Sequence, residues 1–148
     1  MNQKGTYCFV LILLAVLGWP VAASADRCDD IVKEELDRHH TPSEFLNYFD
    51  RGIDYENAGN FQMAIDAYTA AINLVEDSWA YSYRGQVKEK TGDHEGALAD
   101  YSRAIELNPC NGDYYSDRAK IKKELGDVAG AQEDEEMVNK LLDEEYGL

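Results

Sequence analysis

The sequence predicts an all-α fold: a solenoid of three helix-turn-helix repeats, preceded by one extra helix. Three observations predict it. The chain repeats itself every 33 or 34 residues, each copy divides into two stretches with helical spacing of apolar residues, and a glycine followed by Asn or Asp separates those stretches. Hydrophobic residues make up 45% of the chain and charged residues 29%, which is enough apolar material for a core.

The repeat becomes visible when the chain is shifted against itself. A shift of 33 places residues 45–77 on residues 78–110, and a further shift of 34 reveals a third copy. Self-similarity at this period is typical of helical units that bury their apolar faces by stacking. Residues shared by the first two copies include Tyr48/Tyr81, Arg51/Arg84, Gly52/Gly85, Ala64/Ala97, Tyr68/Tyr101 and Ile72/Ile105, and the third copy repeats Tyr115, Arg118, Gly126, Ala131, Asp134 and Leu141.

Each copy passes from its first helix to its second at the same signal. Glycine can close a helix in the left-handed conformation, and Asn or Asp caps the free N–H groups of the next helix. Small residues also recur on both helices and predict close contact between them. The turn signals are Gly59-Asn60, Gly92-Asp93 and Gly126-Asp127, and the small residues are Gly52, Gly85 and Ala119 with Ala64, Ala97 and Ala131.

The second copy carries an ordered motif of aromatic and small residues that ends in proline: Tyr81, Gly85, Ala97, Tyr101, Ala104 and Pro109. This motif resembles the tetratricopeptide repeat family, and the resemblance covers residues 45–142. It implies three repeats at residues 43–77, 78–111 and 112–148. The first copy departs from the family pattern at Glu76, where proline is expected, and the third at Glu135, Val138 and Asn139.

Both ends of the array have distinctive sequences. Residues 29–39 contain Ile31, Val32 and Leu36, which predict a short helix within a leading segment at 26–42. The last helix carries an acidic run, which we expect to face water and so form a polar cap on the final repeat. The run consists of Glu133, Asp134, Glu135 and Glu136.

The first 25 residues predict a secretory signal peptide that is cleaved after Ala25. Residues 8–17 form an unbroken apolar run, Pro20 follows it, and small residues stand at the cleavage site. An uncleaved membrane anchor is the alternative, because residues 7–25 have low polarity throughout. With cleavage, the mature protein is exported, either periplasmic or secreted, and is not inserted in the membrane.

Export would place Cys28 and Cys110 in an oxidising compartment, where two cysteines can form a disulfide. The two residues lie far apart in the sequence, so only the fold decides whether their sulfur atoms meet, and free thiols remain the alternative. No histidine stands at ligand spacing from either cysteine. The sequence therefore predicts no metal site.

The charge balance excludes several classes of partner. With 14 basic and 29 acidic residues, the chain has a formal net charge of −15. Such a surface repels phosphate groups, so nucleic acid is not an expected partner. No nucleophile stands beside a recognisable base, and no glycine-rich phosphate loop is present. His94 occupies the repeat position held by Phe61 in the first copy, which favours packing over chemistry. The sequence predicts neither an enzyme nor a bound cofactor.

The resemblance implies that the first helices of the repeats line a concave groove, which in this family holds a peptide or protein segment. Large apolar residues gather at one end of the expected groove, as is usual in a binding patch. The alternative is that the helix at 29–39 folds over them. The basic clamp that some members use for a C-terminal carboxylate is not reproduced, because Phe49 and Ile53 stand at the matching positions. The candidate groove residues are Leu46, Phe49, Ile53, Trp79, Tyr83, Gln86, Lys120 and Lys123.

These observations predict a non-catalytic adaptor or scaffold that binds a partner protein or peptide in the groove. The alternative is a self-associating structural module of a cell-envelope assembly, in which the apolar N-terminal end pairs with a second copy to form a homodimer. A size that depends on protein concentration would separate the two.

Overall fold

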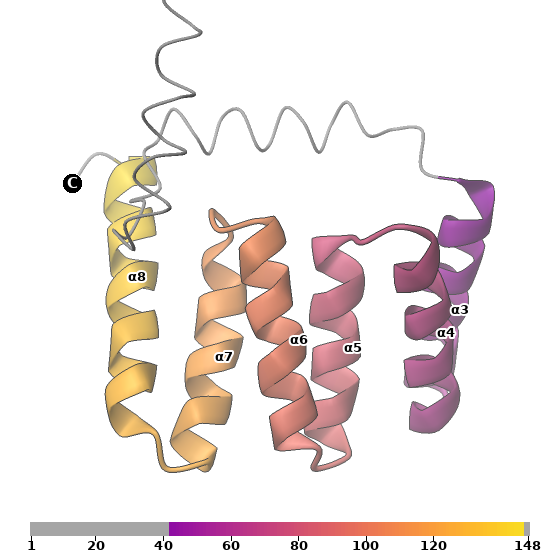
Figure 1. Cartoon of the computed structure of the whole chain (residues 1–148), viewed down its shortest axis with the longest axis horizontal. Helices are drawn as coiled ribbons and strands as arrows, with labels where there is room; N and C mark the ends of the chain where they lie inside the picture. Colours follow the sequence, from indigo (N-terminus) through magenta and orange to yellow (C-terminus); the bar gives the residue numbers. More distant parts are fainter. Residues whose placement is uncertain (1–41, 147–148) are drawn as a thin grey trace, which may run out of the picture.

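The computed structural model of the protein describes residues 42–146, with side chains as far as Asp143. Six helices stand side by side in a row of three antiparallel pairs, with α3 and α4 at one end and α8 at the other (Figure 1). No strand occurs among residues 42–146, which confirms the predicted all-α solenoid. The helices are α3 (Ser43–Asn57), α4 (Phe61–Leu74), α5 (Ser78–Lys90), α6 (His94–Leu107), α7 (Gly112–Glu124) and α8 (Val128–Tyr146).

Three sequence predictions fall wholly or partly on residues 1–41, outside the described part of the chain. These are the signal peptide at 1–25, the helix at 29–39 and the pairing of Cys28 with Cys110, and all three stay predictions. None of the described helices combines the length and the apolar content needed to span a membrane.

The glycine turn inside each pair is built as the sequence predicts, but the predicted cap is wrong at Asn60, whose side chain accepts no capping hydrogen bond at the start of α4. Gly59, Gly92 and Gly126 have φ angles of 74°, 81° and 86°. A Cβ atom at any of the three would meet nothing within 4 Å, so the left-handed backbone and not a lack of space requires glycine there. Asp93 then caps α6 by accepting a hydrogen bond from the Gly96 amide at 3.0 Å.

In the first two pairs, the two helices approach closely because a glycine faces a tyrosine ring. A Cβ atom on Gly52 would lie 2.4 Å from the ring of Tyr68, and one on Gly85 would lie 3.1 Å from the ring of Tyr101. Both rings are fully buried. Each ring therefore packs directly on the backbone of the neighbouring helix, and the predicted role of the small residues at 52 and 85 is confirmed.

Consecutive pairs are joined by shared apolar clusters. Ala71 and Ile72 of α4 pack with Ala80 of α5. One repeat further on, Ala104 and Ile105 of α6 pack with Tyr114 of α7. We call the contact between the second helix of one pair and the first helix of the next pair a joint; the structure has two, α4–α5 and α6–α7.

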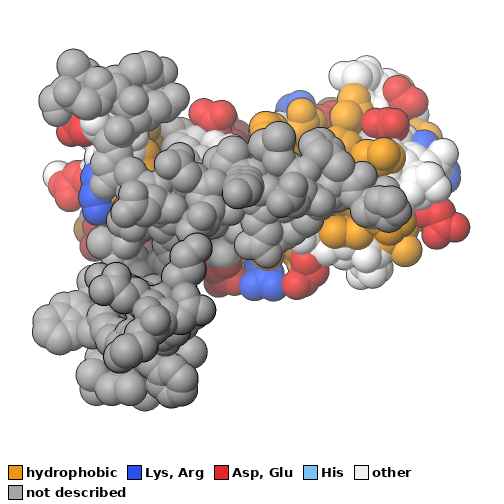
Figure 2. Space-filling view, turned by 90° about the horizontal axis from the view of Figure 1, so that it is seen from above, with side chains coloured by type: hydrophobic (Ala, Val, Ile, Leu, Met, Phe, Trp, Pro, Cys, Tyr) orange, Lys and Arg blue, Asp and Glu red, His pale blue; other side chains and the backbone are white. Residues whose placement is uncertain are grey.

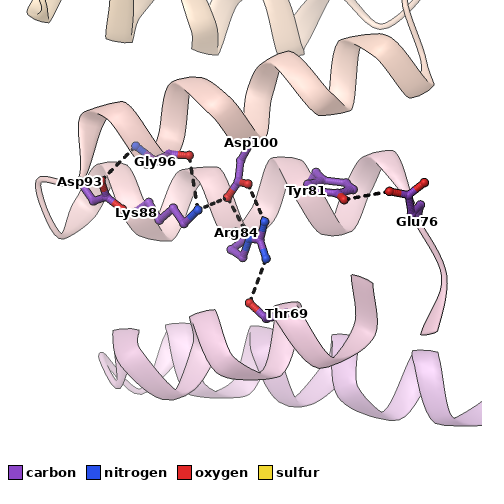
Figure 3. Close-up of polar contacts among 8 residues, drawn as sticks. All are labelled: Thr69, Glu76, Tyr81, Arg84, Lys88, Asp93, Gly96 and Asp100. Atoms are coloured by element: carbon purple, nitrogen blue, oxygen red, sulfur yellow. Dashed lines mark hydrogen bonds and ion pairs between the residues drawn. The ribbon is translucent and has the colours of Figure 1, made fainter. Parts of the chain in front are cut away.

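A half-buried arginine connects three helices at each joint, as Figure 3 shows for Arg84. Arg84 donates to both carboxylate oxygens of Asp100, at 2.9 and 2.7 Å, and its third nitrogen donates to the Thr69 hydroxyl at 2.9 Å. Lys88 adds a second cation 2.8 Å from the same carboxylate. At the next joint, Arg118 pairs in the same way with Asp134 and Ser102.

This arrangement corrects the expectation for α8. Glu133, Glu135 and Glu136 are exposed as predicted, but Asp134 is only 3% exposed, and the prediction that it faces water is wrong. Burial alone would raise the pKa of Asp134, but the hydrogen bonds from Arg118 and Lys122 outweigh it and leave the pKa below its ordinary value. Asp134 therefore holds α7 and α8 together.

Candidate protein-binding face

The first helices of the three pairs, α3, α5 and α7, form one continuous surface through side chains that meet across the pairs. We call it the A-helix face. The face has two parts. Its aromatic end, on α3 and α5, consists of Leu46, Phe49, Ile53, Trp79 and Tyr83. Its acidic row, which follows along α3, α5 and α7, consists of Glu56, Glu89 and Asp117 with the neighbouring Gln86, Lys90 and Lys120.

The floor of the aromatic end is made of rings in contact. Phe49 stacks on Phe45 with ring centroids 5.8 Å apart and meets Tyr83 of α5 edge-on at 5.2 Å. Phe49, Tyr83 and Ile53 also pack against the buried Tyr68. These half-buried side chains therefore contribute to the fold as well as to the surface.

Two side chains beside this floor remain open to solvent. Leu46 is 48% exposed and Trp79 is 49% exposed, and the ring centroids of Trp79 and Tyr114 lie 6.4 Å apart with nearly perpendicular rings. Seen from above, apolar side chains gather at the α3–α4 end of the molecule among acidic ones (Figure 2). Exposed apolar surface surrounded by polar groups is the usual composition of a protein-binding patch.

The acidic row is built from two repeated contacts. Glu56 accepts a hydrogen bond from the Tyr68 hydroxyl at 3.1 Å and pairs with Lys90 of α5 at 2.6 Å. One repeat further on, Glu89 accepts from the Tyr101 hydroxyl at 3.1 Å and pairs with Lys120 of α7. A buried tyrosine thus fixes each carboxylate, and each lysine is held by a carboxylate of the preceding repeat.

Asp117 continues the row on α7. Burial raises the pKa of the Asp117 carboxyl and the charge of Glu89 raises it further, whereas a hydrogen bond from Gln86 and the charge of Lys120 offset part of this rise. The ionised form of Asp117 is therefore poorly compensated. A cation placed beside it would stabilise that form.

The structure brings most of the predicted groove residues together on the A-helix face. Leu46 and Trp79 are exposed, Phe49, Ile53 and Tyr83 are half-buried, and Gln86 and Lys120 join the acidic row. Lys123 differs, because it pairs with Glu135 of α8 within its own helix pair. Cys110 forms a disulfide, and its predicted partner Cys28 lies outside the described residues, so that pairing stays a prediction.

Sequence reasoning missed the arginine–aspartate pairs of the joints. The signal was present, because Arg84 with Asp100 and Arg118 with Asp134 recur at the same shift. It also missed a hollow of about 200 Å³ at the outer edge of the first pair, lined by Tyr48, Arg51, Tyr55, Met63, Asp66, Ala67 and Ala70. Within residues 42–146, no group of three or more His, Cys, Asp or Glu could hold a metal ion.

Comparison with known proteins agrees with this geometry. The tetratricopeptide repeat family matches residues 78–109, which form the second helix pair. The second TPR of Spaghetti (RPAP3), solved with the HSP90 peptide SRMEEVD, is 25% identical with a TM-score of 0.63, over 66% of this chain and 92% of that one. The TPR2B domain of yeast Sti1, solved in a pHsp70 complex, is 25% identical with a TM-score of 0.66, over 69% and 82%. The described residues thus form an all-α solenoid of the tetratricopeptide repeat fold, and the similar structures include modules solved with bound peptides.

A curated relative is similar over part of its length. The photosystem I assembly protein Ycf3 of Acaryochloris marina (strain MBIC 11017) is 32% identical over 84 residues, which cover 54% of this chain and 51% of that protein. The chain thus spans about half the length of this relative.

Proposed function

We propose that the protein is an adaptor that holds a segment of a partner protein on its A-helix face, and that this segment carries apolar side chains next to Lys or Arg. One observation carries the proposal: Leu46 and Trp79 stay about half exposed on the same face of the first helices that carries the acidic row. Aromatic and aliphatic anchors on such a surface supply most of the affinity, and neighbouring charges select the partner.

The charge distribution favours a basic segment over an acidic one. The similar RPAP3 module is solved with a peptide that ends in EEVD. In this chain Lys90 and Lys120 are already paired with Glu56 and Glu89, so few free cations remain to receive an acidic peptide. A Lys or Arg of the bound segment would instead meet the poorly compensated carboxylate of Asp117.

A selection from displayed random peptides tests the proposal. We expect wild-type protein to enrich sequences that combine aromatic or aliphatic residues with Lys or Arg. The variant Leu46→Ala/Trp79→Ala should lose this enrichment, since truncation of a central anchor weakens binding by about 2 kcal/mol or more. Both side chains are exposed, so the fold should persist and the loss would report on binding.

Val128→Ala serves as the matched control. Val128 is 66% exposed on α8, far from the A-helix face, so its truncation should leave the selected peptides unchanged. Equal enrichment by wild type and by the Leu46/Trp79 variant would move the binding surface elsewhere. Selection of peptides with acidic C-termini would refute the proposed charge preference.

We further propose that the protein works after export, in the periplasm or outside the cell. The apolar run and small-residue cleavage site of residues 1–25 support this, as does the disulfide at Cys110, because disulfides persist in oxidising compartments. Mass spectrometry of the protein from its host should find an N-terminus at Asp26. An intact N-terminus together with alkylatable thiols at Cys28 and Cys110 would refute export.

A further inference from the structure

Both joints use the same polar contacts in the same register. The arginine of the first helix grips a carboxylate of its own pair and reaches a hydroxyl of the preceding pair: Thr69 for Arg84 and Ser102 for Arg118. One turn earlier, a tyrosine hydroxyl donates to the connection that leads into its own helix: Tyr81 to Glu76 at 3.3 Å and Tyr115 to the Pro109 carbonyl at 3.2 Å.

The outer edge of α3 carries half of such a joint. Tyr48 and Arg51 stand where the joints have their tyrosine and arginine, but Ala67 occupies the place of Asp100 and Asp134. Arg51 donates to the Tyr55 hydroxyl at 3.2 Å and lies 5.7 and 5.8 Å from the rings of Tyr48 and Tyr55. Among the described residues no carboxylate pairs with it, and it borders the hollow at this edge.

The outer face of α8 carries the complementary half. Glu136 stands at the position of Thr69 and Ser102, and Asp143 at the position of Glu76 and Pro109. The first pair lacks a carboxylate at Ala67. Glu136 supplies one on α8, at the position from which a preceding helix would contact Arg51. Glu136 and Asp143 are both exposed.

The isoleucine contact of the internal joints has a polar counterpart at the two ends of the molecule. Ile72 packs in one cluster with Ala80, and Ile105 in one cluster with Tyr114. At the two ends of the molecule the same register gives Asn139 on α8 and Asn47 on α3, both exposed. The amide side chains of Asn139 and Asn47 can hydrogen-bond to each other, whereas an isoleucine at either position would face a polar side chain. Leu142 on α8, which is 45% exposed, adds apolar surface at the position of Val75.

We propose that α8 of one copy docks on α3 of a second copy in the register of the two internal joints, with Glu136 paired to Arg51 and Asp143 accepting from the Tyr48 hydroxyl. The occupant of the hollow beside Arg51 is thus a second copy of this chain. The contact uses α8 of one copy and α3 of the other. An assembly of any length therefore keeps a free α3 edge at one end and a free α8 face at the other, and it can grow as an open chain. This inference is independent of the A-helix face.

Sedimentation velocity across a concentration series of the purified protein tests the inference. Wild type should grow beyond a dimer as concentration rises. Arg51→Ala and Glu136→Ala should each weaken association at least tenfold, while circular dichroism confirms unchanged helix content. An equimolar mixture of the two variants should form a dimer and nothing larger, because only the Arg51 of one variant and the Glu136 of the other can still meet.

Charge exchange provides the matched control. Arg51→Glu and Glu136→Arg should each abolish association because like charges then face each other, and the double variant should restore it. A wild-type protein that stays monomeric at every concentration would overturn the inference. Loss of association in Arg51→Ala but not in Glu136→Ala would also overturn it, since that result would indicate pairing of two α3–α4 edges.

Discussion

At the scale of single residues, the glycine on the first helix of each of the first two pairs, Gly52 and Gly85, sets how closely the two helices pack. The first pair is the tighter, because a Cβ atom on Gly52 would come within 2.8 Å of three atoms of the Tyr68 ring. That ring is fully buried and hydrogen-bonded to Glu56, so it has no free space to move into.

Gly52→Ala should therefore destabilise the protein by about 1–3 kcal/mol, the range typical of overpacking a buried site. Gly85→Ala should have a smaller effect, because the nearest Tyr101 ring atom is 3.1 Å from the added carbon. Urea unfolding followed by circular dichroism measures both. Asp54→Ala, at an exposed position of α3, should stay within about 0.5 kcal/mol of wild type. A Gly52→Ala variant as stable as this control would refute the packing account.

Asp117 should make the proposed binding to the A-helix face depend on pH. Its pKa is raised, mainly by burial, so the carboxyl ionises at a higher pH than an aspartate carboxyl ordinarily does. Affinity for a Lys-containing or Arg-containing peptide should increase through that interval, and Asp117→Asn should lack this step. At neutral pH the variant should bind about fivefold more weakly, as expected for loss of a partly exposed ion pair of about 1 kcal/mol. Fluorescence anisotropy with a selected peptide measures both effects.

The same shift has a consequence for stability. Because the folded-state pKa of Asp117 lies above the unfolded value, the folded protein binds this proton more readily, and stability falls as pH rises through the interval. Asp117→Asn should consequently be more stable than wild type at neutral pH, and the difference should shrink on acidification. A variant less stable than wild type at neutral pH would show that Asp117 is instead stabilised by its neighbours.

At the scale of helices, the joints depend on carboxylates buried between two cations. Asp100 is 4% exposed and contacts both Arg84 and Lys88. Removal of its charge leaves two cations at the joint without their counter-ion, which is far more costly than loss of a surface pair.

Asp100→Asn should reduce the free energy of unfolding by about 3 kcal/mol, whereas Arg103→Ala should reduce it by at most about 1 kcal/mol. Arg103 is the suitable control because its partners Glu76 and Glu106 are largely exposed. Equilibrium urea denaturation compares the two variants. Similar losses in both would mean that the arginine–aspartate pairs align the joint without stabilising it.

At the scale of the whole molecule, the net charge of −15 opposes the compact state through self-repulsion. Salt screens this repulsion, but it also screens exposed ion pairs such as Lys90–Glu56. The excess of acidic over basic residues is large, so we expect repulsion to dominate. The melting temperature should rise by a few degrees on addition of about 0.15 M salt, where the Debye length is about 8 Å. A melting temperature that falls with salt would show that the exposed ion pairs prevail.

The sequence by itself determined the helical class, the repeat and the turns. Period, helical spacing and the glycine turns are local features, so residues such as Gly92 and Tyr101 could be assigned correctly without knowledge of the packing. For the candidate site, the sequence placed its expected residues on the first helices but could not give their contacts. Leu46 and Trp79 are exposed as a binding patch requires, whereas Phe49 and Tyr83 also belong to the core.

Only the tertiary structure decided which charged groups meet. Lys120 and Lys123 look alike in sequence, yet one pairs with Glu89 on the A-helix face and the other with Glu135 of α8. Asp134 stands in an acidic run but is buried, because stacking of α7 against α8 brings Arg118 and Lys122 to it. The physical reason is that long charged side chains select partners within a few ångströms across helices, and sequence spacing along one helix does not contain that information.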